Sequence, residues 1–168
     1  MVFDVADGQL RAAERALSQG TYDLVSYVYT ATDRLQHPFW SLHEPELYGD
    51  WQPPAQIKDQ DYVEEAYRRA DDALGRVLAA MPDDTLVFVV SDHGVDPHDG
   101  RMEEGEAGHR SDGIWIAAGP GVTANPERLE MRVIDVMPTA LRCAGAPVAE
   151  DFDGVAVAGV CPASSEPE

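Results

Sequence analysis

Aspartate and histidine occur together in three short segments whose spacings suit metal binding. Asp33 and His37 are four residues apart in TDRLQH, so their side chains are neighbours on one face if the segment is helical. His109, in GEAGHRSDG, is a candidate third ligand of the same ion, and three protein ligands leave the open position that a catalytic metal needs. Asp92 and His93, in SDHG, are candidate ligands of a second ion. Two ions about 3.5 to 4 Å apart would hold the attacking and leaving oxygens of a displacement at phosphorus.

Each of these segments also has a purely structural interpretation. An Asp and a His four residues apart are more often solvated or capping a helix than binding a metal, and His109 by itself is most simply a loop residue. SDHG is more specific, because a polar group directly after the apolar run TLVFVV adds little to the stability of a strand. His43 is most simply a surface residue. His98, in VDPHDG, either reaches substrate or is a solvated loop residue, and solvation is the simpler interpretation.

Three segments rich in apolar residues predict the strands that position these side chains. Residues 22–30, YDLVSYVYT, are rich in β-branched and aromatic residues and lead directly into TDRLQH. Residues 85–90, TLVFVV, are apolar on both faces, which is typical of a central strand in a parallel sheet, and they end at SDHG. GIWIAAG predicts a further strand at 113–119. Ligands of parallel α/β sheets collect at the carboxyl ends of the strands, where both metal-binding segments lie.

Helical periodicity marks three further segments. Apolar residues from Leu10 to Leu17 recur at helical spacing, and Gly20 supplies a stop signal. The longest stripe runs from 61 to 81, where Asp61 and Glu64 resemble a capping box and a proline follows the last residue. A third helix is expected over 133–141. The alternation of helices and strands predicts an α/β sandwich with a largely parallel sheet.

Two segments between these elements are expected to be loops. The stretch up to Pro54 is rich in proline and aromatic residues without periodicity, and residues 95–111 are polar and contain glycine. The aromatic side chains of the first loop are Trp40, Tyr48 and Trp51. They either cover the leaving group of a bound substrate or pack against the edge of the sheet.

The composition is strongly acidic. The 168 residues include 31 acidic and 12 basic side chains, which gives a formal net charge of -19. Such a charge repels nucleic-acid phosphates and anionic membranes, so nucleic acid is excluded as a general partner. No apolar stretch approaches the roughly 20 residues that span a bilayer, and we expect no membrane association. A hydrated surface adapted to high salt is favoured over an acidic patch for one partner.

The cysteine count and the two termini give weaker expectations. Cys143 and Cys161 are too few for a disulfide framework or a thiolate zinc cluster, which fits a reducing cytoplasm. The N-terminal residues lack the basic start and apolar core of a secretory signal. We expect residues 1–160 to belong to one domain and residues 161–168 to form a flexible acidic tail.

The order of TDRLQH, SDHG, GHRSDG and DVMPTAL resembles the alkaline phosphatase superfamily, and within it the type I phosphodiesterase and nucleotide pyrophosphatase group. The resemblance implies a three-layer α/β/α sandwich and a site of two divalent metal ions. In this chain Asp33, His37 and His109 would hold one ion, and Asp92 and His93 the other. Nitrogen and oxygen ligands without sulfur suit zinc or manganese. The DVMPT segment would form a helix that packs behind the site.

The chain also departs from this family pattern. Family members carry a further metal-binding Asp and a Thr or Ser nucleophile before the DxxxH segment, and neither is identifiable here. The chain therefore resembles the C-terminal half of a phosphohydrolase domain, incomplete at its N-terminus, and a separately encoded N-terminal half is a candidate partner. The expected activity is metal-dependent hydrolysis of a small phosphate mono- or diester. The alternatives are a catalytically inactive metal-binding remnant and a phosphomutase or sulfatase of the same superfamily.

Overall fold

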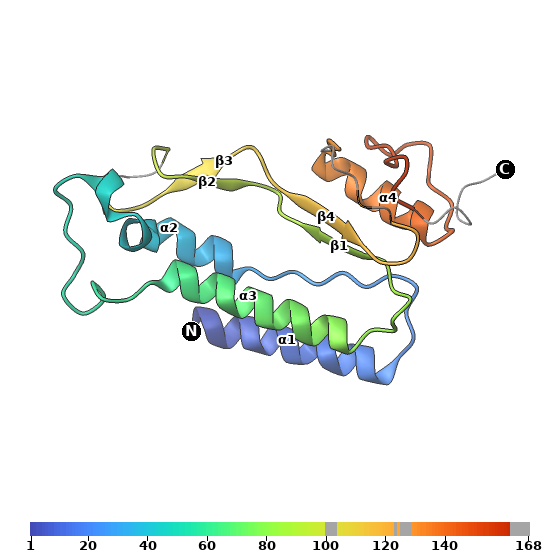
Figure 1. Cartoon of the computed structure of the whole chain (residues 1–168), viewed down its shortest axis with the longest axis horizontal. Helices are drawn as coiled ribbons and strands as arrows, with labels where there is room; N and C mark the ends of the chain where they lie inside the picture. Colours follow the sequence, from blue (N-terminus) through green and yellow to red (C-terminus); the bar gives the residue numbers. More distant parts are fainter. Residues whose placement is uncertain (100–103, 123, 125–128, 162–168) are drawn as a thin grey trace. The chain divides into compact units, whose positions relative to one another are not determined.

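The computed structural model combines helices with short strands, as expected of the α/β class (Figure 1). It describes residues 1–99, 104–122, 124 and 129–161, so most of the predicted tail lies outside the described residues. The chain divides into two compact units. The first consists of Met1–Thr21, Ser26–Met81 and His93–Asp112, and the second of Tyr22–Val25, Pro82–Asp92 and Gly113–Glu168.

Three helices form most of the first unit. They are α1 (Val2–Gln19), α2 (Ala31–His43) and α3 (Tyr62–Ala79), with the short 3-10 helix η1 (Pro45–Tyr48) after α2. The sequence predicted the first and the third, whereas the second occupies a stretch in which Trp40 was expected to lie in a loop, and that expectation is wrong because the chain turns helically through Pro38 as far as His43. Figure 1 shows α1 and α3 lying side by side. Their apolar faces meet in a small core of Leu10, Ala73 and Val77, against which Leu17, Tyr27, Tyr29 and Met81 pack. This core holds α1 against α3, and α2 packs in turn against α3.

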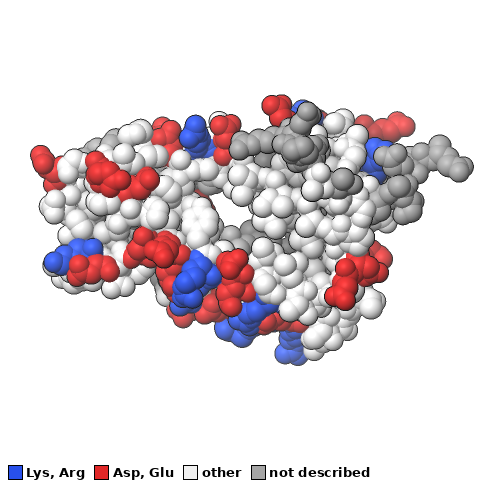
Figure 2. Space-filling model, in the orientation of Figure 1, with Lys and Arg blue, Asp and Glu red and all other residues white. Residues whose placement is uncertain are grey.

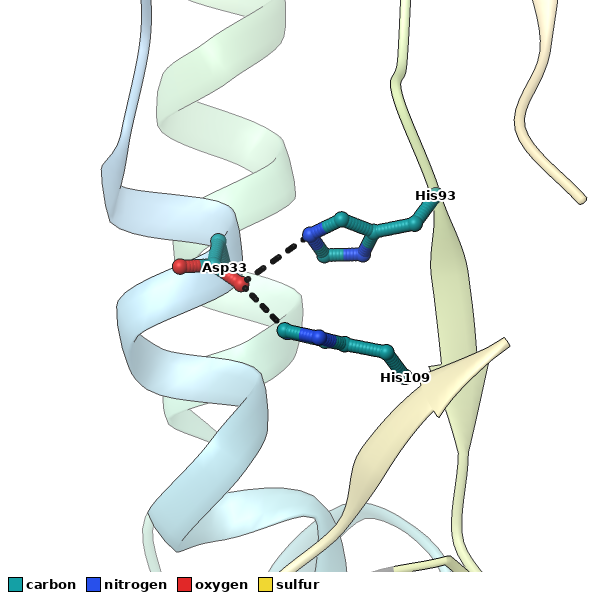
Figure 3. Close-up of side chains that lie close together, drawn as sticks. All are labelled: Asp33, His93 and His109. Atoms are coloured by element: carbon teal, nitrogen blue, oxygen red, sulfur yellow. Dashed lines mark ion pairs between the residues drawn. The ribbon is translucent and has the colours of Figure 1, made fainter. Parts of the chain in front are cut away.

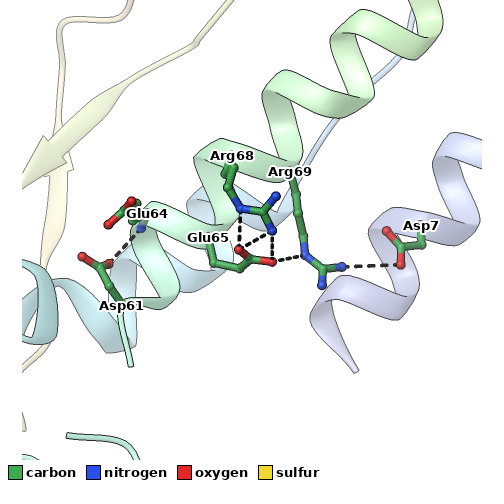
Figure 4. Close-up of polar contacts among 6 residues, drawn as sticks. All are labelled: Asp7, Asp61, Glu64, Glu65, Arg68 and Arg69. Atoms are coloured by element: carbon green, nitrogen blue, oxygen red, sulfur yellow. Dashed lines mark hydrogen bonds and ion pairs between the residues drawn. The ribbon is translucent and has the colours of Figure 1, made fainter. Parts of the chain in front are cut away.

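Polar contacts define where α3 begins and how it lies against α1 (Figure 4). Asp61 accepts a hydrogen bond of 2.8 Å from the Glu64 amide, which confirms the predicted N-cap. Arg69 donates to Glu65 at 2.7 Å and lies 3.6 Å from Asp7 on α1. Since water screens exposed ion pairs, these contacts set the orientation of the helices more than their stability, which comes from apolar burial.

The polar segment after SDHG forms a small antiparallel sheet instead of the expected loop. Strand β2 (Gly94–Asp96) pairs with β3 (Gly108–Arg110), and Val95 lies opposite His109. Three-residue strands are too short to leave a two-residue periodicity that sequence analysis could detect. Gly108 is required for this close packing, since a Cβ there would lie 2.6 Å from the carbonyl oxygen of Asp99.

The prediction of a strand over residues 22–30 is wrong for the described structure. The segment precedes α2 without entering either sheet, although it keeps an alternating pattern in which Tyr27 and Tyr29 pack on the core while Val28 is exposed. Its composition favours a strand, but a strand also needs a hydrogen-bonding partner. Among the described residues no such partner is paired with it.

The second unit contains the other two strands that the sequence predicts, β1 (Val87–Val90) and β4 (Trp115–Ala118). They pair antiparallel, with Val87 opposite Ala118 and Val90 opposite Trp115. The expected largely parallel sheet is therefore not formed by the described strands. Parallel neighbours need a crossover connection, usually a helix, and no α-helix is described between these two strands.

The C-terminal part of the second unit is held together by the DVMPT segment. Its Asp135 ends the 3-10 helix η3 (Val133–Asp135), and its other residues begin α4 (Val136–Cys143). The buried Asp135 carboxylate accepts hydrogen bonds from Arg132 and, at 2.8 Å, from the Val155 amide. The Thr139 hydroxyl accepts at 3.0 Å from the Val157 amide. These two side chains bind the segment that follows α4.

A disulfide joins Cys143 at the end of α4 to Cys161, 18 residues later. The sequence analysis excluded a disulfide framework and did not predict this single bond. Two cysteines far apart in a sequence say nothing about the distance between their Cβ atoms, which decides whether a bond forms. Because disulfides persist mainly in oxidising compartments, this bond also removes the argument from the cysteines for a reducing cytoplasm.

Acidic side chains outnumber basic ones on the face of the molecule in Figure 2, as the composition leads one to expect. No helix among the described residues has the length and apolar character needed to cross a membrane.

We expect Asp135→Asn to lower the free energy of unfolding at pH 7. Hydrogen bonds from Arg132, followed by that from the Val155 amide, hold the pKa of Asp135 well below its usual range. A carboxylate with a lowered folded-state pKa stabilises the fold above its unfolded-state pKa of about 3.9, and this contribution is lost as the pH falls further. Urea unfolding should therefore show a difference between wild type and variant that shrinks from pH 7 to pH 3. Asp151→Asn, at an exposed position, is the control. A difference that did not change with pH would contradict a role for the ionised carboxylate.

Candidate metal centre

Helix α2 presents the first two candidate ligands. Asp33 lies in the first turn of this helix and His37 one turn later, so both side chains project from the same face. The Nε2 atom of His37 lies 3.3 Å from the Oδ1 atom of Asp33. The carboxylate is favourably placed there, because the N-terminal end of a helix carries a partial positive charge.

The small sheet of the first unit brings two more histidines to the same carboxylate. His93 precedes β2, and His109 lies in the paired strand β3. The Nε2 atoms of His93 and His109 lie 3.7 Å and 3.5 Å from Oδ1 of Asp33 (Figure 3). The two rings are in contact, with their centroids 3.9 Å apart and their planes tilted by 37°. Three imidazoles therefore surround one carboxylate oxygen.

Backbone carbonyls fix which ring nitrogen of two histidines carries the proton. Nδ1 of His37 lies 2.7 Å from the carbonyl oxygen of Ala107, and Nδ1 of His93 lies 3.1 Å from that of Gly94. A carbonyl only accepts hydrogen bonds, so each Nδ1 must donate its hydrogen. The neutral ring then has its lone pair on Nε2, the atom that faces Asp33. In metal sites, a histidine ligand is commonly oriented in the same way, by a hydrogen bond that its other ring nitrogen donates.

A second hydrogen bond holds His37 and Ala107 together. The Ala107 amide donates to the carbonyl oxygen of His37 at 3.0 Å, so the two residues are joined in both directions. Ala107 is buried. His109, two residues further along, then lies with its Nε2 atom 2.8 Å from Nε2 of His37. The position of His109 therefore depends on how the segment before β3 lies against α2.

The distances from the Asp33 carboxylate to the nearby histidine nitrogens suit a tetrahedral divalent ion. Bonds of about 2.0 to 2.2 Å separate the ligand atoms of a tetrahedral zinc site by about 3.3 to 3.6 Å. The three distances from Asp33 to histidine nitrogens, 3.3, 3.5 and 3.7 Å, lie close to this range. The 2.8 Å between His37 and His109 is shorter, so these two rings would separate by about half an ångström on binding. Asp33, His93 and His109 each offer one ligand atom within 4.8 Å of the others.

Access to the cluster is consistent with an open ligand position. The side chains of Asp33 and His109 are 47% and 54% exposed, whereas His93 is 25% exposed. A small ligand can therefore approach from solvent while the histidine rings keep one side packed. A catalytic metal site requires such an open side, whereas a structural site is closed.

The structure brings together four of the five residues that the sequence predicts as ligands: Asp33, His37, His93 and His109. The sequence analysis divided the histidines between two ions, whereas here all three approach the same carboxylate oxygen. Asp92 belongs to the second unit, in an exposed bend, and its role as a ligand stays a prediction. The Ala107 carbonyl is a contributor that sequence analysis missed, because a main-chain acceptor leaves no trace in residue type.

The two remaining histidines have contacts of their own. Nδ1 of His43 lies 2.9 Å from Oδ2 of Asp61, which links the end of α2 to the start of α3. Burial opposes ionisation of Asp61, but the hydrogen bonds from the Glu64 amide and from His43 outweigh it and lower the pKa of this carboxyl. The His98 amide donates to Asp96 in a tight turn. Contact of His98 with substrate stays a prediction.

The family model for type I phosphodiesterase / nucleotide pyrophosphatase matches residues 3–136, well over half of the chain. The chain belongs to this family. The match includes all of the candidate ligands and confirms the resemblance to the alkaline phosphatase superfamily. No curated protein and no solved structure gives a significant match. Members of the family typically depend on divalent metals, which agrees with the donor set gathered around Asp33.

We expect His109→Ala to weaken zinc binding by at least about tenfold, because even the loss of a residue that only orients a ligand costs this much. His43→Ala should bind zinc as the wild type does, since His43 is paired with Asp61 and is not one of the clustered residues. Competition with a chromophoric chelator measures both affinities. If His43→Ala lost zinc while His109→Ala retained it, the ligand set would have to be redrawn.

Proposed function

We propose that the chain is the metal-binding part of a metal-dependent phosphoester hydrolase that acts on a phosphate mono- or diester. The observation that supports this most directly is the approach of three histidine Nε2 atoms to one oxygen of Asp33. The family of the chain supports phosphoester hydrolysis as the reaction class.

Asp33, His93 and His109, with His37 beside them, would hold a zinc or manganese ion. A bound divalent ion supplies charge that polarises a phosphoryl oxygen and activates a water or hydroxyl nucleophile. The task of this chain's own residues is orientation: the carbonyls of Ala107 and Gly94 keep the Nδ1 hydrogens of two rings in place. The resemblance implies a second ion held by Asp92 and His93; because His93 here faces Asp33, Asp92 is the ligand that we propose for that ion.

The acidic surface is compatible with a phosphate substrate. A formal charge of -19 repels anions at a distance, but metal ions are the largest local charges in such sites and reverse the field nearby. The three histidines add no negative charge of their own. A small ester is therefore a better fit than a polyanion, which would meet the acidic surface outside the site. The same surface would suit a setting of high salt.

The nucleophile and the further Asp of the family pattern are not identifiable in this chain, and we propose that another polypeptide segment supplies them. The unpaired residues 22–30 support this proposal, because exposed apolar side chains such as Tyr22 and Leu24 favour a strand that has a neighbour. In the completed domain these residues and β1 would belong to the parallel sheet of a three-layer sandwich. A separately encoded N-terminal half is one source of the missing strands.

A catalytically inactive, metal-binding remnant is the second candidate, and the missing nucleophile favours it. The other chemistries of the superfamily, phosphomutase and sulfatase, would use the same ligands, so they depend on the same missing segment. Activity in the presence of that segment separates these candidates.

We expect the chain alone, loaded with zinc or manganese, to hydrolyse p-nitrophenyl phosphate and bis(p-nitrophenyl) phosphate poorly or not at all. Positioning of the attacking group contributes about 7 to 11 kcal/mol of a barrier reduction, and this chain holds no identifiable nucleophile. A separately expressed N-terminal half from the same locus should raise the turnover, and Asp33→Asn should abolish the gain.

Two results would count against this account. Metal retained without any gain in turnover would favour the inactive remnant. Robust turnover by the chain alone, lost on Asp92→Ala, would reveal a nucleophile or a reactive bound water within this chain. His43→Ala is the control, because His43 is paired with Asp61 and is not one of the clustered residues.

A further inference from the structure

An indole ring in the loop after η1 packs directly on a glycine before β3. A Cβ added to Gly105 would lie 2.6 Å from Cε2 and Cζ2 of Trp51 and 2.7 Å from Oγ of Ser41. Gly105 also has a φ of +78°, a conformation that side chains disfavour. Both the space and the backbone conformation therefore require glycine at this position.

Trp51 is linked to α2 through Tyr48 and η1. The Trp51 amide donates to the Tyr48 carbonyl oxygen at 3.2 Å, and the two rings lie 6.5 Å apart. Tyr48 is 5% exposed and ends η1, which packs against α2. Ser41, on α2 itself, is 1% exposed. Trp51 and Ser41 together form a rigid surface on which Gly105 rests.

This contact lies immediately before the residues that complete the cluster. Two residues after Gly105, Ala107 forms its pair of hydrogen bonds with His37. A shift of Gly105 away from the indole is expected to displace Ala107, because only two peptide units separate them, and His109 follows two residues later.

We propose that Trp51 and Gly105 are positioning residues for the candidate metal centre. Their contact sets the distance between residues 105–109 and α2. At this distance the His37 ring can donate to the Ala107 carbonyl, and the His109 ring can approach Asp33. Metal ligands must lie within about 0.2 Å of their ideal distances, so a displacement of a few tenths of an ångström is enough to weaken binding. The effect on metal rests on the proposed function, whereas the effect on His37 exists without metal.

The experiment compares Gly105→Ala with Gly145→Ala. Gly145, after α4, has a φ of +70° but nothing within 4 Å of an added Cβ, so it reproduces the backbone strain without the collision. Zinc affinity is measured by chelator competition. Long-range ¹H–¹⁵N NMR spectra of the metal-free chain at pH 8 report which ring nitrogen of His37 carries the hydrogen.

We expect Gly105→Ala to bind zinc at least about tenfold more weakly than the wild type and to lose the Nδ1–H form of His37, while Gly145→Ala keeps both. Trp51→Ala removes the supporting indole without backbone strain and should act like Gly105→Ala, which covers the case in which Gly105→Ala does not fold. Equal zinc affinity and an unchanged His37 tautomer in Gly105→Ala, or the same losses in Gly145→Ala, would overturn the proposal. If the wild type bound no zinc, the metal centre would fail, and the NMR comparison would still decide the positioning role.

Discussion

The pair of hydrogen bonds between His37 and Ala107 is the interaction on which the candidate site depends. It joins α2 to a segment 70 residues later in the chain and acts on both backbone and side chain. The same contact leaves the Nε2 lone pair of His37 facing Asp33 and brings His109 within reach. A donor set that combines ring nitrogens and a carboxylate without sulfur, in a phosphodiesterase family chain, is consistent with catalysis by a divalent metal.

Those parts of the fold that local sequence determines could be predicted. The apolar stripe and the Asp61 cap define α3, and Gly20 follows the end of α1 as a stop signal. The spacing of Asp33 and His37 fixes their shared face once α2 forms, since a helix turns once every 3.6 residues. The composition also identified β1 and β4, but the direction of their pairing depends on the connection between them, which residue types do not encode. For residues 22–30, the composition favoured a strand that has no paired neighbour here.

Less of the site could be predicted than of the helices. The resemblance grouped Asp33, His37 and His109, and the structure places these three together. It did not predict that His93 would face the same oxygen, because that proximity follows from the pairing of two three-residue strands. The Ala107 carbonyl and the Gly105 contact with Trp51 are long-range backbone features, so no spacing in the sequence reports them. The Cys143–Cys161 bond was missed for the same reason.

The site combines a rigid base with an open face. Packing on Trp51 and the buried Ala107 fix one side, whereas the exposed side chains of Asp33 and His109 leave room for a small ligand. X-ray absorption at the zinc edge of the zinc-loaded chain tests the central claim directly. The account predicts only nitrogen and oxygen neighbours at about 2.0 to 2.2 Å, with the outer-shell scattering of at least two imidazole rings. Sulfur neighbours at about 2.3 Å, an absence of imidazole scattering, or loss of zinc on dialysis would contradict it.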